Sequence, residues 1–311
     1  MINLSEEPRI RRMDYITKEE YEEINRLCKL CCEQDKINLK LELDYKLHLA
    51  SLKELNTAKV SSDLNEFLYY TGEKLVSYLG ISCFDGITGE ITGMTHPAFR
   101  GQGLFTRLLA LARKECEHRS FRKLLLLTDG NSETGVNFTK AAGFAYEHSE
   151  YRMKRLSAQS DLPIGASAVT LRPAYREDEP EIAMMNSLFF DDAILDANTG
   201  DPVIKALADD PENFKTYMVE LADVCIGKIN VEFSEDYAFI CGFGIRPEFR
   251  GNGYGRAALN STLRIIEDQH IRTTELDVVC TNKRALLLYQ SCGFHEISIM
   301  NYYSLPSLAD N

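Results

Sequence analysis

The sequence of 311 residues lacks the features that mark several other classes of protein. No apolar run approaches the ~20 residues that a membrane-spanning helix needs. The first residues, MINLSEEPRIRR, contain no apolar signal-peptide core. The hydrophobic fraction of 44% and the charged fraction of 26% are those of a globular chain with room for two domains. We therefore expect a cytoplasmic protein without a membrane segment.

Positive charge is scarce, because 35 Lys and Arg residues face 47 Asp and Glu residues and the net charge is −12. A surface of this sign repels phosphate backbones and anionic lipids. We therefore expect neither a nucleic acid nor a membrane as a partner, and a mild preference for cationic substrates.

Paired cysteines of the metal-binding kind are also missing. Nine cysteines occur without a signal peptide, which predicts free thiols. Cys28, Cys31 and Cys32 form a CxxCC cluster, but no second cysteine or histidine pair stands at zinc-ligand spacing. We therefore predict no metal site and interpret the cluster as thiols buried on a helix.

The sequence does contain an internal repeat. Residues 97–103 read PAFRGQG and residues 247–253 read PEFRGNG, which places them 150 residues apart. The pair Gly143-Phe144 recurs at the same separation as Gly293-Phe294. Two landmarks that share one long offset indicate a duplicated domain rather than a solenoid.

Both copies carry the same elements around these landmarks. A strand-like stretch precedes the Pro-x-Phe-Arg-Gly segment, and a helical pattern, a buried strand and a second helix ending at Gly-Phe follow it. The strands are predicted over residues 89–95, 239–245, Lys123–Thr128 and Glu275–Cys280, and the second helices begin near Asn131 and Asn282. This order predicts an α/β fold for each copy, with a mixed, partly parallel sheet flanked by helices.

The repeat also sets the domain boundaries. We predict an N-terminal domain over residues 1–156 and a C-terminal domain over residues 168–311, joined by the polar linker Ser157–Ala168.

The front of the first copy is less uniform. Thr17 and Glu20 form a capping-box pattern that predicts a helix through about Glu33. The alternation in Leu39–Leu49 favours a strand, whereas its composition favours a helix, and both remain open.

The second copy has a glycine-rich loop, Arg250-Gly251-Asn252-Gly253-Tyr254-Gly255. Glycines at a helix N-terminus let several backbone N–H groups converge, and the helix dipole adds positive potential that suits a phosphate. Arg250 and Arg256 add charge suited to a pyrophosphate. The loop fits neither the P-loop pattern GxxxxGK[ST] nor the dinucleotide pattern GxGxxG. A tight strand-to-helix turn without a ligand is the alternative.

Together with its flanking elements, the loop resembles that of the GCN5-related N-acetyltransferases, which carry R/Q-x-x-G-x-G/A for the pyrophosphate of coenzyme A. Residues 281–294, TNKRALLLYQSCGF, resemble the helix ending in Tyr-x-x-x-Gly-Phe that follows in this family. The resemblance is strong over residues 239–303 and moderate over 89–155, and the tandem arrangement is similar to that of the mycothiol synthases. It implies two such domains in tandem and acyl transfer from acetyl-CoA to an amine.

The resemblance also implies roles for individual residues. Backbone N–H groups around Ile245 would face the thioester carbonyl, and Asn282 would cap its helix and contact the pantetheine arm, or cap the helix alone. Tyr289 would protonate the leaving thiolate, since a phenol with a pKa near 10 stays protonated at neutral pH; a buried aromatic is the alternative. The predicted cofactor-binding residues are Ile245, Arg250, Gly251, Asn252, Gly253, Tyr254, Gly255, Arg256, Asn282 and Tyr289.

The general base is less defined. Family members often carry a Glu eight residues before the Pro of the loop, and this sequence has Phe239 there, which cannot accept a proton. We predict Glu232, on the preceding strand, as the catalytic base. A solvated carboxylate at Glu232, with water relaying the proton, is the alternative.

The first copy departs from the pattern at two positions. Phe105 replaces the last glycine of the loop, and Thr139 stands at the position of Tyr289, with Phe138 beside it. A threonine hydroxyl is too short and too weak an acid for the same work. We predict that this copy is catalytically degenerate and either holds coenzyme A or serves as a packing partner.

The expected function is transfer of an acetyl group from acetyl-CoA to a primary amine by direct attack; the alternative is a non-catalytic acyl-CoA-binding regulatory or scaffold protein. A small-molecule or peptide amine is the expected acceptor, and a polyamine, an aminoglycoside-like sugar, an amino acid and a protein N-terminus remain open.

The acidic segment Phe189–Phe214 borders the acceptor site in this interpretation, or is a solvated surface. We expect a monomer, since a tandem chain can mimic a dimer.

Overall fold

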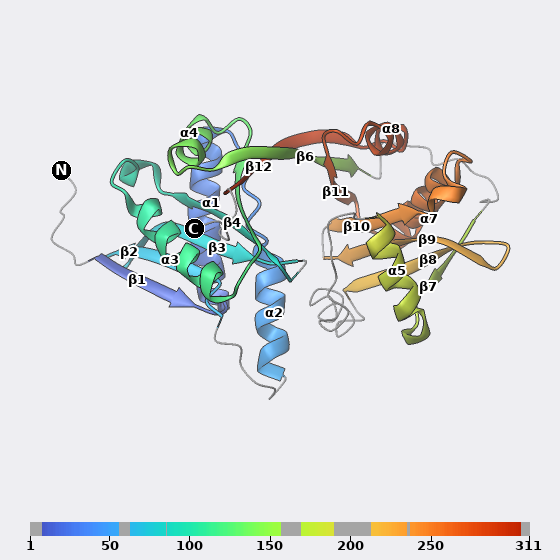
Figure 1. Cartoon of the computed structure of the whole chain (residues 1–311), viewed down its shortest axis with the longest axis horizontal. Helices are drawn as coiled ribbons and strands as arrows, with labels where there is room; N and C mark the ends of the chain where they lie inside the picture. The colour runs from blue at the N-terminus through green and yellow to red at the C-terminus, as the bar shows by residue number, and fades with distance from the viewer. Residues whose placement is uncertain are drawn as a thin grey trace. The chain divides into compact units, whose positions relative to one another are not determined.

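The computed structural model describes residues 8–55, 63–84, 86–156, 169–189, 213–234 and 237–305. They form two compact units, of which the first comprises Met1–His148 and Met300–Asn311 and the second Ser149–Ile299 (Figure 1). The predicted linker and residues 190–212 of the acidic segment lie outside the described residues. None of the helices described is both long and apolar enough to cross a membrane.

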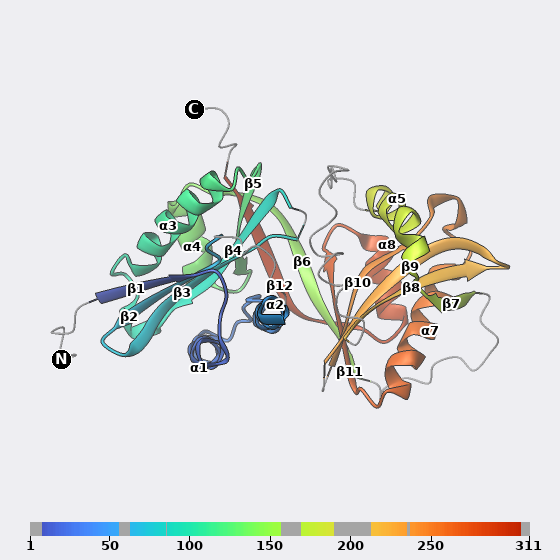
Figure 2. The same ribbon diagram turned by 90° about the horizontal axis from the view of Figure 1, so that it is seen from below.

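The first unit is built on a mixed sheet in the order β1-β2-β3-β4-β5-β12. The strands are β1 (Pro8–Met13), β2 (Glu66–Thr71), β3 (Lys74–Ser82), β4 (Thr88–Thr95), β5 (Lys123–Asp129) and β12 (His295–Ser304), and the helices are α1 (Lys18–Asp35), α2 (Leu43–Leu55), η1 (Pro97–Phe99), α3 (Leu104–His118) and α4 (Glu133–Ala141). β4 and β5 are parallel, whereas the other neighbours are antiparallel. α1 and α2 lie on one face of the sheet, with α3 and α4 on the other (Figure 2).

The second unit repeats this plan in the order β6-β11-β10-β9-β8-β7. Its strands are β6 (Ala145–Leu156), β7 (Thr170–Pro173), β8 (Phe214–Leu221), β9 (Val224–Phe233), β10 (Tyr237–Ile245) and β11 (Thr273–Val279), and its helices are η3 (Arg176–Asp178), α5 (Glu179–Phe189), η4 (Pro247–Phe249), α7 (Tyr254–Asp268) and α8 (Lys283–Ser291). β10 and β11 form its parallel pair. The predicted mixed, partly parallel sheet flanked by helices is therefore confirmed in both units.

The last strand of each copy pairs with the other copy. β6 follows α4 in the chain but pairs with β11, with Met153 opposite Leu276. β12 follows α8 but pairs with β5, with Tyr303 opposite Leu126. These two pairings are related by the same offset of 150 residues that relates the copies. The domains 1–156 and 168–311 follow the sequence repeat and remain a prediction. The compact units differ from them, because the final strand of each copy completes the sheet of the other.

Each sheet holds its helices through a separate apolar core. In the second unit, Leu259, Leu263 and Ile266 recur at helical spacing on α7 and are fully buried against Ile229 and Val231 of β9. Burying each such side chain contributes roughly 1.5–3 kcal/mol. In the first unit, Leu108 and Ala112 of α3 are buried in the equivalent core, which Tyr303 of β12 also enters.

The helices α1 and α2 belong to the front of the first copy, where the sequence was less uniform. The capping box is confirmed: Thr17 caps α1, the backbone N–H of Thr17 donates to Glu20 (2.9 Å), and the helix ends at Asp35. The ambiguous segment Leu39–Leu49 is irregular at first and then forms α2 from Leu43, so its helix-forming composition prevails there. The CxxCC thiols lie on α1, with Cys31 buried and Cys28 and Cys32 half-buried. Across the described ranges, no group of three or more potential ligands is placed to hold a metal ion.

Candidate functional site

The glycine-rich loop of the second unit connects η4 to α7. Gly251 and Gly253 have φ angles of +84° and +81°, which side chains rarely adopt, and a Cβ on either would meet no atom within 4 Å. Conformation therefore requires glycine at these positions, and the space beside them is open. Gly253 caps α7 without a side-chain hydrogen bond. The first N–H groups of α7 thus face an open, exposed loop, an arrangement that suits an anionic group.

Arg250 anchors the loop to the end of β10. The Nε of Arg250 donates a 2.7 Å hydrogen bond to the carbonyl oxygen of Ile245, the last residue of β10. The amide of Asn252 donates to the carbonyl oxygens of Phe249 and Arg250, both at 3.3 Å. Gly255 is not strained, and a Cβ there would be 3.5 Å from Leu288 of α8, an ordinary contact. These contacts fix the loop where β10, α7 and α8 meet.

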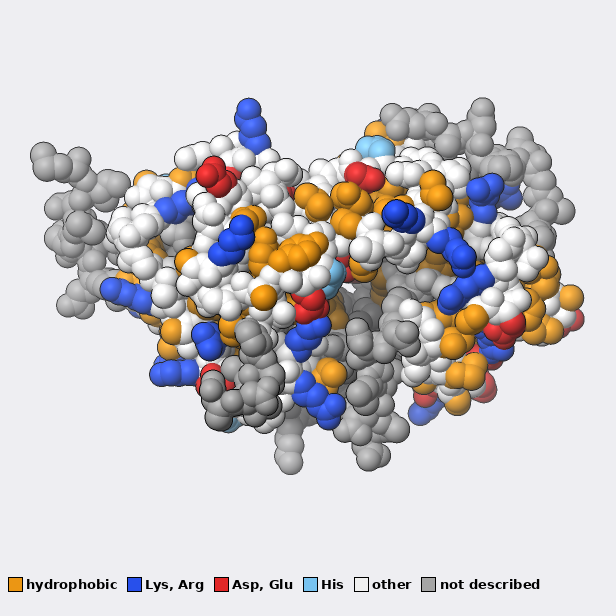
Figure 3. Space-filling model, turned by 45° about the horizontal axis from the view of Figure 1, so that its top comes forward, with side chains coloured by type: hydrophobic (Ala, Val, Ile, Leu, Met, Phe, Trp, Pro, Cys, Tyr) orange, Lys and Arg blue, Asp and Glu red, His pale blue; other side chains and the backbone are white. Residues whose placement is uncertain are grey.

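Exposed cations surround the loop, and sequence reasoning found only some of them. Arg250 and Arg256, the two cations that the sequence singled out, are exposed, and so are Lys283 and Arg284 in the first turn of α8. Figure 3 shows Lys and Arg side chains gathered at the right of the view, over the unit that contains α7 and α8. The pair Lys283-Arg284 directly after the helix cap was the signal that could have revealed these two residues. The cations add positive potential where phosphates would bind.

β10 changes direction beside the loop. It pairs in parallel with β11 from Tyr237–Thr273 to Ile240–Leu276, and within the described residues its last five residues have no partner on β11. Its antiparallel register with β9 shifts between Cys241 and Gly244, which marks a β-bulge. A bulge re-aims the backbone of a strand, so this is where N–H groups near Ile245 can turn toward a substrate.

Tyr289 lies on the inner side of α8. Its side chain is buried, with its ring edge-on to Phe294 at 6.0 Å between centroids. Burial, with a smaller contribution from Cys292, raises the pKa of Tyr289 to about 12. The phenol therefore stays protonated throughout the neutral range and can donate a proton. The alternative interpretation, a buried aromatic, describes the same side chain, so burial and proton donation are compatible.

Two further predicted residues have defined surroundings. Asn282 caps α8, and its Oδ1 accepts a 3.1 Å hydrogen bond from the backbone of Ala285. Glu232 is half-buried on β9 and lies opposite Phe239 of β10, whose ring is covered by the guanidinium of Arg152 at 4.8 Å. The pantetheine contact of Asn282 and the role of Glu232 as the catalytic base remain proposals.

The first unit has the same loop but different surroundings. Gly101 and Gly103 have φ angles of +74° and +72°, close to those of the second copy. Arg100 donates to the carbonyl oxygen of Thr95 at 3.1 Å and also forms a 2.7 Å ion pair with Asp35 of α1. Phe105 points inward and packs edge-on against Phe138.

The position of Tyr289 is filled differently in the first unit. Thr139 is 1% exposed, and its hydroxyl donates a 2.8 Å hydrogen bond to the carbonyl oxygen of Val136 in its own helix. In addition, β4 pairs with β3 in unbroken register from Ser77–Thr95 to Ser82–Glu90, without the bulge of β10. These differences support the prediction that this copy is degenerate.

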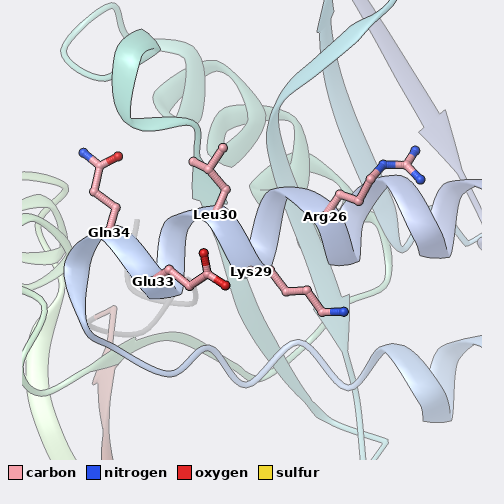
Figure 4. A pocket seen from close by; sticks show the side chains of 5 residues that line it. All are labelled: Arg26, Lys29, Leu30, Glu33 and Gln34. Carbon is pink, nitrogen blue, oxygen red and sulfur yellow. The ribbon is translucent and has the colours of Figure 1, made fainter.

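A surface hollow of the first unit is unrelated to either loop. The residues that line it all come from one exposed side of α1: Arg26, Lys29, Leu30, Glu33 and Gln34 (Figure 4). A hollow bounded by a single helix cannot enclose a substrate, so the open loop beside β10 is the better candidate site.

The comparisons agree with this geometry. A sequence model of the Acetyltransferase (GNAT) family matches residues 32–144 and 173–294. A mycothiol acetyltransferase of Pseudarthrobacter chlorophenolicus is 24% identical over 247 residues, which cover 72% of each chain. Two solved structures share the fold: a GCN5-related N-acetyltransferase from Sphaerobacter thermophilus (TM-score 0.73, 17% identity, covering 96% of this chain and 95% of that one) and a tandem GNAT protein from the clavulanic acid biosynthesis pathway (TM-score 0.72, 14% identity, 98% and 100%).

The fold and the repeated loop define an acyl-CoA-dependent N-acyltransferase with two domains in tandem. The chain belongs to the Acetyltransferase (GNAT) family, which it matches twice. Of the two functions that the sequence left open, the comparisons thus support the enzyme.

Proposed function

We propose that the second copy transfers an acetyl group from acetyl-CoA to a primary amine by direct attack. The observation that carries this proposal is the open, glycine-capped N-terminus of α7 beside the bulged β10 and the buried phenol of Tyr289. The mycothiol acetyltransferase among the relatives supports a small-molecule acceptor.

The residues present fit acetyl-CoA as a substrate. Backbone N–H groups at Gly253 and the first turn of α7 would bind the pyrophosphate, assisted by Arg250 and Arg256. Arg284 and Lys283 would add charge for further phosphate groups. No side chain at Gly251 or Gly253 obstructs the approach.

In the chemical step, the amine nitrogen forms a bond to the acetyl carbonyl carbon and the carbon–sulfur bond breaks. Backbone N–H groups at the end of β10 would stabilise the carbonyl oxygen as it gains charge. Tyr289 would donate its proton to the departing sulfur. Burial keeps this phenol protonated, so its proton is available to the departing sulfur while the carbon–sulfur bond breaks. The proton lost by the amine goes to Glu232 or to water.

The test is a calorimetric titration of acetyl-CoA into the full chain, followed by a thiol-release assay over a panel of amines. We expect one binding site and release of coenzyme A that depends on the amine. Failure to bind acetyl-CoA at millimolar concentration would refute the proposal. Binding without turnover of any amine, polyamines, amino sugars, amino acids and peptides included, would refute its catalytic part alone.

A further inference from the structure

The strand next to the β10 bulge carries two polar side chains that the proposed mechanism does not use. Lys228 and Asn230 stand two positions apart on β9, so they point to the same face of the sheet. Ile229 and Val231 alternate with them and enter the core beneath α7. Lys228 and Asn230 therefore lie on the opposite face, where α5 packs on β9 and β10 (Figure 2).

Lys228 is tied to the bulge itself. Its side chain is 1% exposed, and its Nζ donates a 3.0 Å hydrogen bond to the carbonyl oxygen of Gly242. Lysine is almost never buried to this degree unless it is paired. A bulge has lost regular ladder bonds, so a side-chain donor on one of its carbonyl groups helps to fix its conformation. Gly242 has a φ angle of +54°, which shows that the backbone turns at this residue.

The side-chain oxygen atom of Asn230, Oδ1, is buried without a hydrogen-bond partner among the described residues. Buried polar atoms in native proteins are nearly always paired, so such an exception indicates a missing partner. The same amide is held close to the bulge, because a Cβ on Gly242 would lie 2.5 Å from its Nδ2 and 3.0 Å from Nζ of Lys228.

In the first unit, the side chain of Lys46 occupies the equivalent place. The residues 150 positions before Lys228 and Asn230 are Tyr78 and Gly80. There Nζ of Lys46 lies directly over the strand, 2.4 Å from where a Cβ on Gly80 would be. It donates to Glu66 at 2.8 Å and to the hydroxyl of Tyr78 at 3.3 Å. In the first unit, oxygen acceptors at this position of the sheet thus bind an amine nitrogen of the chain itself.

We propose that Lys228 and Asn230 work as a pair in the acetyl transfer of the second copy, Asn230 Oδ1 accepting a hydrogen bond from the acceptor amine while Lys228, a positioning residue, holds the bulge through Gly242. This inference rests on the proposed function. The N–H of a neutral amine would satisfy the amide oxygen and leave the nitrogen lone pair for attack.

The experiment is steady-state kinetics on the full chain, with acetyl-CoA and the best amine of the panel, for Asn230→Ala, Asn230→Asp, Lys228→Met and Lys228→Arg. We expect Asn230→Ala to raise KM for the amine about tenfold, the effect of one lost hydrogen bond to a buried group, with the Kd for acetyl-CoA unchanged. Asn230→Asp keeps an acceptor oxygen and should restore most of the loss. Lys228→Met should lower kcat about tenfold without weakening acetyl-CoA binding, and Lys228→Arg should recover part of it.

The control is Lys215→Met on β8, whose ammonium lies over the ring of Phe233 on the other face of the sheet and whose loss should not affect kinetics. An amine KM within about twofold of wild type in Asn230→Ala would overturn the role of that residue. Lys228→Met that loses acetyl-CoA binding together with activity, without rescue by arginine, would overturn positioning in favour of a purely structural role. A wild-type chain that binds acetyl-CoA but acetylates no amine would instead refute the proposed function, and this inference with it.

Discussion

The two copies share a loop and differ in almost everything that surrounds it. Both place two glycines with positive φ at an uncapped helix N-terminus. In the second copy, the neighbouring strand is bulged and a buried phenol stands on the following helix. In the first copy, that strand is regular, and Thr139 stands in place of the phenol with its hydroxyl bonded to its own helix. The conformation suited to a pyrophosphate and the groups suited to acyl transfer are therefore separable properties of one fold.

The largest expected effect concerns which copy each final strand stabilises. Tyr303 is buried in the core of the first unit and Met153 in that of the second, although each belongs to the other copy in sequence. Replacing a buried side chain of this size by alanine costs roughly 3 kcal/mol. We expect Tyr303→Ala to lower hydrogen-exchange protection in β2–β5, and Met153→Ala to lower it in β8–β11. The opposite pattern would contradict the strand exchange.

The two glycine loops should differ in how strongly acetyl-CoA binding depends on them. Gly253→Val should weaken acetyl-CoA binding about thirtyfold, because a β-branched residue is strained at this positive φ. The matched Gly103→Val should leave binding unchanged, since the guanidinium of Arg100 is already engaged by Asp35 at 2.7 Å. Calorimetry measures both variants, and a comparable loss in Gly103→Val would show that the first copy also binds acetyl-CoA.

A smaller effect is expected from the phenol. Tyr289→Phe should lower kcat at least about tenfold while acetyl-CoA affinity is retained, because it removes a proton donor and little volume. With a pKa raised to about 12, ionisation of Tyr289 should cause no fall in kcat at moderately alkaline pH. Stopped assays of thiol release measure both quantities. Thr139→Val is the matched change in the first copy and should leave kcat unaltered; full activity of Tyr289→Phe would remove the phenol from the mechanism.

The smallest effect is shared by the two units. Burial opposes ionisation of Glu20, but hydrogen bonds from Thr17 and Arg11 outweigh it and lower its pKa. In the second unit, the hydrogen bond from Arg172 lowers the pKa of Asp178 against the effect of burial. A carboxyl whose pKa is lowered by folding stabilises the protein above its unfolded pKa, and this contribution is lost as the pH falls through the folded value.

We therefore expect Glu20→Gln to lower the free energy of unfolding by about 1 kcal/mol near neutral pH, the usual value of a helix cap. The difference from wild type should shrink in acid, as wild-type Glu20 itself becomes protonated. Urea denaturation at neutral and acid pH measures the change, with Asp178→Asn as the matched variant. A difference that grows toward low pH would contradict the assignment.

Much of the fold could be predicted because its signals are local. Helical spacing and the pattern of glycines identified the loop and the helix after it from a few neighbouring residues. The strand exchange could not be predicted, because β5 and β11 are equivalent partners for either final strand under the repeat.

The candidate site was predicted in part for the same reason. Tyr289 and the glycines belong to a contiguous pattern, whereas Lys228 and Asn230 look like solvated positions of an alternating strand. Lys228 and the Oδ1 atom of Asn230 are buried where α5 packs on β9 and beside the bulge at Gly242, which are tertiary features. The segment 190–212, expected to border the acceptor site, lies outside the described residues.

The exchange of β6 and β12 bears on how the protein is made. Domains usually fold in the order in which the ribosome produces them, N-terminal first. Here the sheet of the first unit is completed by Met300–Ser304, which are translated after the second unit. The second unit has its exchanged strand, β6, before any of its other strands emerge. The half of the chain that is synthesised first is therefore the half whose sheet can close only after the second half has been translated.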